Sequence, residues 1–172
     1  MAQVAFTVAV VVQIAILTAI PARKAMTRMT GRSVVLKVQP VDPYSILSGY
    51  YVTLGFEISR LDAFPGAPSL TEGETCYAVI ERGEEDGIWR PFSLERVMPS
   101  DLPENRAVVA GRMESGQLIK YGIESFFIPE SKRNVIAEDL RKNRDRARVA
   151  VKLDSAGHAA LVKLMIEDRI YQ

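Results

Sequence analysis

The sequence predicts a mainly β protein of the α+β class: an antiparallel barrel or sandwich-like domain with one amphipathic helix, preceded by a single N-terminal transmembrane helix. Three observations predict it. Residues 4–20 are almost entirely apolar. Residues 33–171 contain about eight short strand-like stretches separated by turn signals. One segment, residues 130–143, has helical periodicity among charged residues instead. We therefore expect an anchor over residues 1–24, a connector over 25–32 and a β-rich domain over 33–172.

The anchor is predicted from the stretch VAFTVAVVVQIAILTAI, in which only Thr7, Gln13 and Thr18 are polar. At about 1.5 Å per residue, residues 4–22 span roughly the hydrocarbon core of a bilayer. A cleaved signal peptide is the competing interpretation. The missing basic leader and the poor cleavage site at residues 21–24 favour an uncleaved anchor. The Gln13 amide either faces a partner helix or is tolerated in lipid, and the second interpretation is the simpler.

Charge is distributed unevenly along the chain. Residues 1–32 hold no acidic residue and four basic ones, so all 21 acidic residues and the other 18 of the 22 basic residues lie in the β-rich part. This balance gives no electrostatic case for nucleic-acid binding. Basic residues that follow an anchor place the domain in the cytoplasm by the positive-inside rule, provided that Met1 is the natural start.

Cysteine and histidine each occur once, as Cys76 and His158. A single cysteine excludes an intramolecular disulfide, and the pair cannot form the usual zinc clusters. We therefore predict no metal site, no cofactor and no small-molecule cofactor partner. Cys76 fits a small buried hydrophobe. His158 follows a Ser-Ala-Gly turn and fits a solvated turn residue; general base is the alternative.

The first part of the domain has a clear strand signal. Residues 33–39 are β-branched and predict a strand. In residues 50–59 one face would carry Tyr50, Val52, Leu54, Phe56 and Ile58, which is the strongest period-two pattern in the chain. Between them, residues 42–49 fit one helical turn, with Asp42 as N-cap, Pro43 at the first helical position and Gly49 after the end.

The rest of the domain is predicted as hairpins around one helix. Residues 74–82 and 88–98 flank an acidic turn, with Pro91 marking an edge or a bulge. Residues 106–114 and 117–121 form a second hairpin, and residues 122–129 are extended. After the helix, residues 146–153 and 158–171 are predicted strands. Their core faces would be those of the following residues: Ala147, Val149, Val151, Leu153, Ala160, Val162, Leu164 and Ile166.

Two stretches carry a resemblance to a known family. Residues 41–59, VDPYSILSGYYVTLGFEIS, resemble the signature of the GDYXXLXY family of membrane-anchored proteins, and YGIESFFIPE at 121–130 resembles its second recurring stretch. Gly49, Tyr51 and Leu54 fit the motif. Tyr50 stands where the family has Asp, and Phe56 stands where it has the final Tyr. The motif and possible interaction residues are therefore these: Asp42, Pro43, Gly49, Tyr51, Leu54 and Phe56.

The resemblance implies a topology and a kind of partner. Members carry an extracytoplasmic domain and associate with multi-span membrane proteins, and their biochemical role is uncharacterised. We therefore expect a periplasmic or equivalent location for the domain, with the cytoplasmic side as the alternative that the flanking charges favour.

Two clusters of polar residues are candidate functional sites. Asp42, Ser45 and Ser48 fit a capped turn better than a nucleophile with an acid, so no catalytic residue is predicted. A basic run near the predicted helix fits a solvated face, interleaved as it is with acids, and is also the obvious contact for membrane lipid. Its members are Lys132, Arg133, Arg141, Lys142 and Arg144.

These observations favour a non-enzymatic, membrane-anchored β domain that acts as a subunit or accessory of a larger membrane protein assembly. A tethered domain meets a partner in the same membrane at raised effective concentration. The alternative is an envelope enzyme or ligand-binding module that acts on peptide, glycan or lipid. It needs a cleft in which Asp42, Ser45, Ser48, Glu57 and His158 converge.

Overall fold

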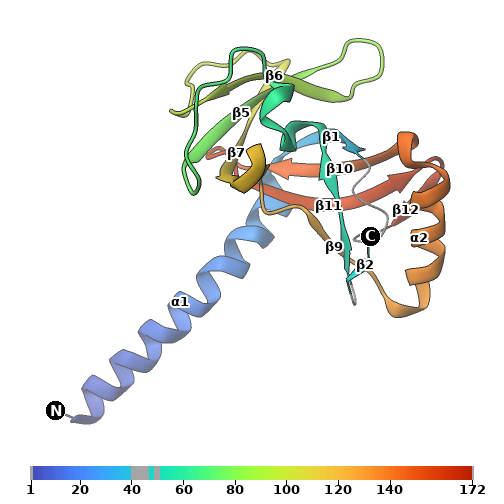
Figure 1. Ribbon diagram of the computed structural model, residues 1–172. Helices are drawn as coiled ribbons and strands as arrows, with labels where there is room; N and C mark the ends of the chain where they lie inside the picture. The colour runs from blue at the N-terminus through green and yellow to red at the C-terminus, as the bar shows by residue number, and fades with distance from the viewer. Residues whose placement is uncertain (1, 40–46, 49–50, 172) are drawn as a thin grey trace.

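A β-rich domain sits at the end of one long helix in the computed structural model, which describes residues 2–39, 47–48 and 51–171 (Figure 1). The helix, α1 (Ala2–Thr30), projects away from the domain. Its segment Phe6–Thr30 is long and apolar enough to cross a membrane, and the apolar window is not buried against the domain. The helix continues through residues 25–30, which the sequence predicted as a connector.

Most of the strands belong to one curled sheet, in the order β12-β11-β10-β1-β6-β5-β7-β8. The strands along this path are, in chain order, β1 (Arg32–Gln39), β5 (Thr75–Arg82), β6 (Trp89–Glu95), β7 (Arg106–Glu114), β8 (Leu118–Lys120), β10 (Ala147–Leu153), β11 (Ala159–Ile166) and β12 (Arg169–Tyr171). A small second sheet has the order β2-β3-β9, with β2 (Leu47–Ser48), β3 (Tyr51–Thr53) and β9 (Ser125–Phe127).

β1 changes its antiparallel partner along its length. The strand pairs with β10 over Arg32–Lys37 and then with β4 (Gly55–Phe56) over Val38–Gln39. The chain after β4 reaches the far edge of the sheet, where Arg60 forms a bridge with Leu118 of β8. The result is the half-barrel that the barrel-like prediction anticipated, with α2 (Arg133–Lys142) at the end of the domain opposite α1 (Figure 1).

The core lies inside this curl and confirms two of the predicted faces. Every second residue from Ala147 to Leu153 belongs to the buried cluster. So do Val52, Leu54, Phe56 and Ile58, although the predicted single strand 50–59 is wrong. The segment instead forms β3, β4 and a 3-10 turn at Glu57–Ser59, and its period-two burial persists across all three.

The last predicted strand, residues 158–171, is also wrong in its extent and in part of its face. A turn at residues 167–168 divides it into β11 and β12, which pair with each other. In β11 the register with β10 shifts, so that Ala150 pairs with Lys163 and Val151 with Leu161. Val162 is therefore a bulge residue, and Ala159 and Leu161 join the core cluster in place of Ala160 and Val162.

Both predicted hairpins are confirmed, β5 with β6 and β7 with β8. The register of the first shifts opposite Pro91, which pairs with Ile80 while Val79 pairs with Ser93. The predicted helix is confirmed as α2, preceded by a 3-10 turn at Glu130–Lys132. Of the predicted turn at 42–49, Leu47–Ser48 form β2, and residues 40–46 and 49–50 lie outside the described residues.

Candidate functional site

The two family-like stretches pair with each other. β3, from the first, lies antiparallel to β9, from the second, with Tyr51 opposite Phe127 and Val52 opposite Phe126. The Leu54 backbone N–H donates to the Glu124 carbonyl at 2.7 Å and extends this pairing. The signature therefore builds a structural joint between segments about seventy residues apart in the chain.

The two signature side chains that the structure describes lie inside the molecule. Leu54 and Phe56 are 2% and 1% exposed. Phe56 thus keeps a ring in the core where the family has Tyr, and it needs no hydroxyl partner there. Of the other motif residues, Asp42, Pro43 and Gly49 lie outside the described residues, as does the side chain of Tyr51.

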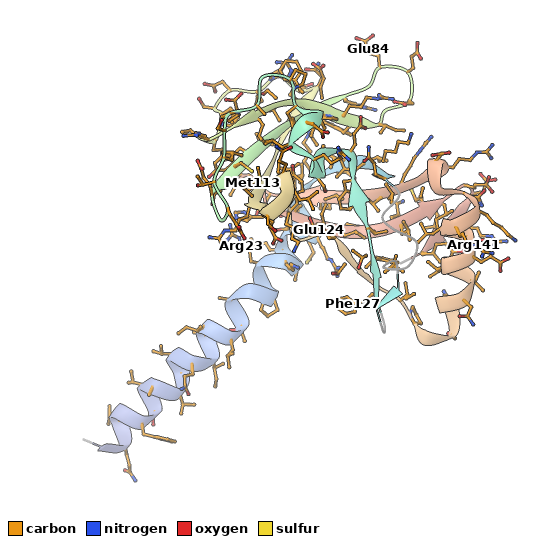
Figure 2. The ribbon with its side chains drawn as sticks, in the orientation of Figure 1. Arg23, Glu84, Met113, Glu124, Phe127 and Arg141 are labelled. Atoms are coloured by element: carbon orange, nitrogen blue, oxygen red, sulfur yellow. The ribbon has the colours of Figure 1, made fainter. Side chains whose placement is uncertain are left out.

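Tyr121 fixes the second stretch to the first. Its buried hydroxyl donates to the Ile58 carbonyl at 2.5 Å. Burial, with smaller contributions from Cys76 and Glu124, raises the pKa of this phenol well above its ordinary value. The hydroxyl therefore stays protonated and serves as a donor. In Figure 2, by contrast, the neighbouring Phe127 points away from the domain, and its side chain is 73% exposed.

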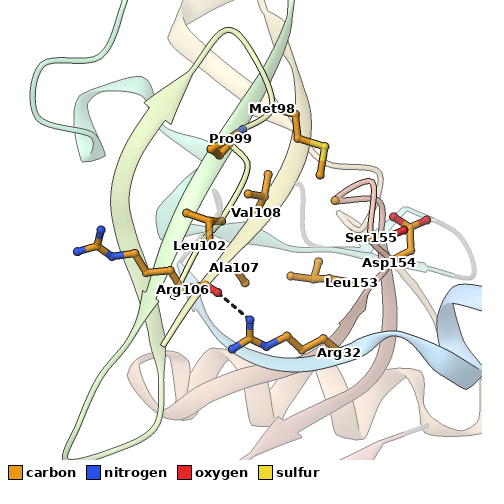
Figure 3. Close-up of a pocket in the computed structure, with 11 residues that line it drawn as sticks. Arg32, Met98, Pro99, Leu102, Arg106, Ala107, Val108, Leu153, Asp154 and Ser155 are labelled. Carbon is orange, nitrogen blue, oxygen red and sulfur yellow. Dashed lines mark hydrogen bonds between the residues drawn. The ribbon is translucent and has the colours of Figure 1, made fainter. Parts of the chain in front are cut away.

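A small cavity lies between β7, the loop that precedes it and the turn after β10 (Figure 3). Its volume is about 190 Å³, below the roughly 300–1,000 Å³ of typical ligand sites. Arg32 reaches it but donates to the backbone carbonyls of Arg106, at 2.7 Å, and Glu104. The same guanidinium lies 4.9 Å from the Trp89 ring centroid. It is engaged in holding β1 to the loop before β7.

Of the five residues proposed to converge in an enzyme site, the structure describes the side chains of Glu57 and His158 only. Neither Glu57 nor His158 lines this cavity or the two surface grooves of about 620 and 560 Å³. Asp42 and Ser45 lie outside the described residues, as does the side chain of Ser48.

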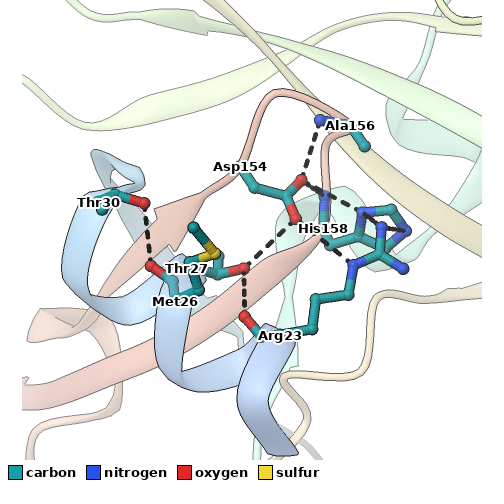
Figure 4. Close-up of polar contacts among 7 residues, drawn as sticks. All are labelled: Arg23, Met26, Thr27, Thr30, Asp154, Ala156 and His158. Atoms are coloured by element: carbon teal, nitrogen blue, oxygen red, sulfur yellow. Dashed lines mark hydrogen bonds and ion pairs between the residues drawn. The ribbon is translucent and has the colours of Figure 1, made fainter. Parts of the chain in front are cut away.

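His158 belongs instead to a polar junction between α1 and the turn that joins β10 to β11 (Figure 4). We call Arg23, Thr27, Asp154 and His158 the junction. The Thr27 hydroxyl bonds the Arg23 carbonyl at 3.0 Å and lies 3.3 Å from Oδ2 of Asp154. Arg23 Nη2 lies 2.7 Å from Nδ1 of His158. The single histidine is exposed, as predicted, and it also contacts the helix.

Asp154 organises the turn at the same time. Its Oδ1 accepts the backbone N–H of Ala156 at 3.0 Å and that of His158 at 2.8 Å. Burial acts to raise the pKa of Asp154, but these hydrogen bonds and the His158 side chain outweigh it, so the pKa lies below its ordinary value. The carboxylate therefore remains charged and keeps its acceptors available.

Backbone packing completes the attachment of α1. Gly31 follows the helix, and a Cβ there would lie 2.5 Å from the Thr27 carbonyl oxygen and 2.8 Å from that of Leu153. On the other side of the turn, the Gly157 carbonyl accepts the Ala110 N–H of β7 at 2.8 Å. α1 thus contacts the end of β10 and the turn after it, and that turn is hydrogen-bonded to β7. No local sequence pattern predicts this junction, because the Thr27–Asp154 contact joins positions 127 residues apart.

The predicted basic face lies on and near α2, away from the end where α1 leaves the domain (Figure 1). Lys132, Arg141 and Lys142 are exposed, while the side chains of Arg133 and Arg144 are not described. Lys142 pairs with Glu138 at 2.6 Å, as expected for a solvated face with interleaved acids. Contact with lipid through these residues stays a prediction.

Two further sequence inferences can be followed to their residues. Cys76 is fully buried, and burial, assisted by the charge of Glu74, raises the pKa of its thiol to about 11. The thiol is thus a small buried hydrophobe, as expected. Within the described ranges, no group of three or more His, Cys, Asp and Glu residues is placed to hold a metal ion.

Comparison with known proteins identifies one relationship. The family model described as GDYXXLXY protein matches residues 13–164, which is most of the chain. No curated protein and no solved structure matches. The matched range runs from the middle of α1 to β11 and includes both stretches that pair as β3 and β9. The chain belongs to the GDYXXLXY family.

Proposed function

We propose that this chain is a non-enzymatic, membrane-anchored subunit or accessory of a larger membrane protein assembly, with its β domain on the extracytoplasmic side. The observation that supports it best is the attachment of α1. The helix continues through Pro21 from its apolar part to the domain, where Thr27 is 3% exposed against the turn after β10. A domain held in this way meets a partner in one orientation, which lowers the entropic cost of association.

The use of the family signature also supports a binding role. Its described side chains, Leu54 and Phe56, pack in the core, and its backbone pairs β3 with β9. A catalytic motif instead presents convergent polar groups to a cleft. The charge balance of the domain gives no electrostatic case for nucleic acid as the partner.

Purification of the tagged full-length chain from its native membranes in a mild detergent tests the assembly. We expect it to migrate in a complex with other membrane proteins in fixed stoichiometry. Recovery of the chain alone under conditions that preserve other membrane complexes would contradict the proposal.

Labelling with a membrane-impermeant maleimide tests the side of the membrane. Glu84 lies in the exposed turn between β5 and β6 (Figure 2), and a Glu84→Cys variant should react in right-side-out vesicles. Cys76 provides the internal control, because it is buried and should react only after unfolding. Reaction of Glu84→Cys only in inverted or opened vesicles would place the domain in the cytoplasm.

A further inference from the structure

The apolar part of α1 contains three polar side chains, and two of them are satisfied by their own helix. The Thr7 hydroxyl donates to the Gln3 carbonyl at 2.9 Å, and Thr18 donates to that of Ile14 at 2.8 Å. Among the described residues, the Gln13 side-chain amide has no such bond. It lies midway along residues 4–22, where hydrocarbon offers neither a donor nor an acceptor.

By ideal helix geometry, Gln13 lies near the side of α1 that faces the domain. Gln13 and Thr27 are 14 residues apart, and at about 100° per residue their directions differ by only about 40°. The domain is on the Thr27 side, because Thr27 is 3% exposed, whereas Met26 and Met29, about 100° and 160° away around the helix, are 67% and 82% exposed. A helix packed against Gln13 would therefore lie beneath the domain.

We propose that Gln13 binds a transmembrane helix of another membrane protein, one with a hydrogen-bonding side chain at the same depth. This inference rests on the proposed function and names the face that would carry it. The partner helix would end at the bilayer surface under the domain, where its following loop meets the β10–β11 turn. Ala9, one turn before Gln13, is small enough for the two backbones to approach closely.

A second copy of this chain does not fit the same face. In a parallel two-fold pair through Gln13, each α1 would continue upwards on the side where the other chain carries its domain. That space is filled at the level of Arg23, Thr27 and Gly31 by the turn after β10. The position of the domain thus selects a helix that stops at the membrane surface.

Site-specific photocrosslinking in intact membranes tests the face. A photoreactive amino acid at Gln13 should form an adduct with a different membrane protein. The same amino acid at Ala15, about 160° away around the helix, is the matched control and should not. Equal adducts from both positions, adducts only with a second copy, or none from either position would overturn the proposal.

Substitution tests the hydrogen bond and separates this proposal from the one on which it rests. Gln13→Leu keeps the size and the apolar character of the span, and we expect the complex to weaken by about three- to thirtyfold. Gln13→Asn, which retains an amide, and Thr18→Val, which removes a hydroxyl already bonded to its own helix, should both retain the complex. If Gln13→Leu assembles like the wild type, this inference fails while the proposed function stands. If the wild-type chain itself runs alone, the proposed function fails.

Discussion

At the scale of single residues, the Tyr121 hydroxyl is the clearest determinant of the joint between the two signature stretches. We expect Tyr121→Phe to lower the free energy of unfolding by about 1–3 kcal/mol, because the buried Ile58 carbonyl loses its donor. Denaturant unfolding of the full-length chain in detergent, followed by the fluorescence of the single, buried Trp89, measures this. Tyr77→Phe is the matched control, since no hydrogen bond of the Tyr77 hydroxyl occurs among the described residues. An equal loss for both variants would contradict this role.

Asp154 gives the junction a pH dependence whose sign follows from its lowered pKa. The folded state favours the charged carboxylate, so its contribution is fully present above the unfolded pKa of roughly 3.9. It is lost as the pH falls through the lower, folded value. We expect the unfolding free energy of the wild type to fall over this acidic range more steeply than that of Asp154→Asn. Parallel pH profiles for the two proteins would exclude Asp154 as a contributor.

At the scale of elements, the bulge in β11 decides which side chains are core. Leu161 is 6% exposed and belongs to the core cluster, whereas Val162 is half-buried outside it. We expect Leu161→Ala to cost about 2–5 kcal/mol of unfolding free energy. Val162→Ala should cost under about 1 kcal/mol, because less apolar area returns to water. The same denaturant experiment measures both, and the reverse order would restore the uninterrupted alternation that the sequence predicted.

Local patterns predicted the elements better than the joints between them. The alternation of Val149, Val151 and Leu153 predicted β10 and its core face correctly, because period two is a property of the strand itself. The bulge at Val162 depends on the register with β10, which no local pattern records. The pairing of β3 with β9 and the junction of α1 with Asp154 depend on contacts between distant segments, so neither was predicted.

The candidate site also has parts that the sequence predicted and parts that only the structure shows. Resemblance identified the two signature stretches, and the structure showed that they pair. Composition identified the apolar helix, and the exposure of Thr27, Met26 and Met29 gave the direction of its domain-facing side. That direction could not come from the sequence, because an apolar helix with little amphipathic character records no preferred face.

At the scale of the whole molecule, the domain should turn with its helix. Insertion of two alanines between Ala22 and Arg23 rotates the domain by about 200° relative to Gln13, whereas insertion of four rotates it by only about 40°. We expect the first to abolish the membrane complex and the second to retain much of it, as judged by native electrophoresis of detergent extracts. Retention by both variants would show that the orientation of the domain does not matter for assembly.

Because α1 continues into the domain as one helix, a tilt of the helix also tilts the domain. A membrane helix that is longer than the local bilayer tilts to match its thickness. Because Arg23, Thr27 and Gly31 fix the helix to the turn after β10, the domain must lean by the same angle. The displacement is largest at the end that carries α2, which lies farthest from the helix (Figure 1). In the proposed assembly, bilayer thickness would thereby set the tilt of the surface that faces the partner.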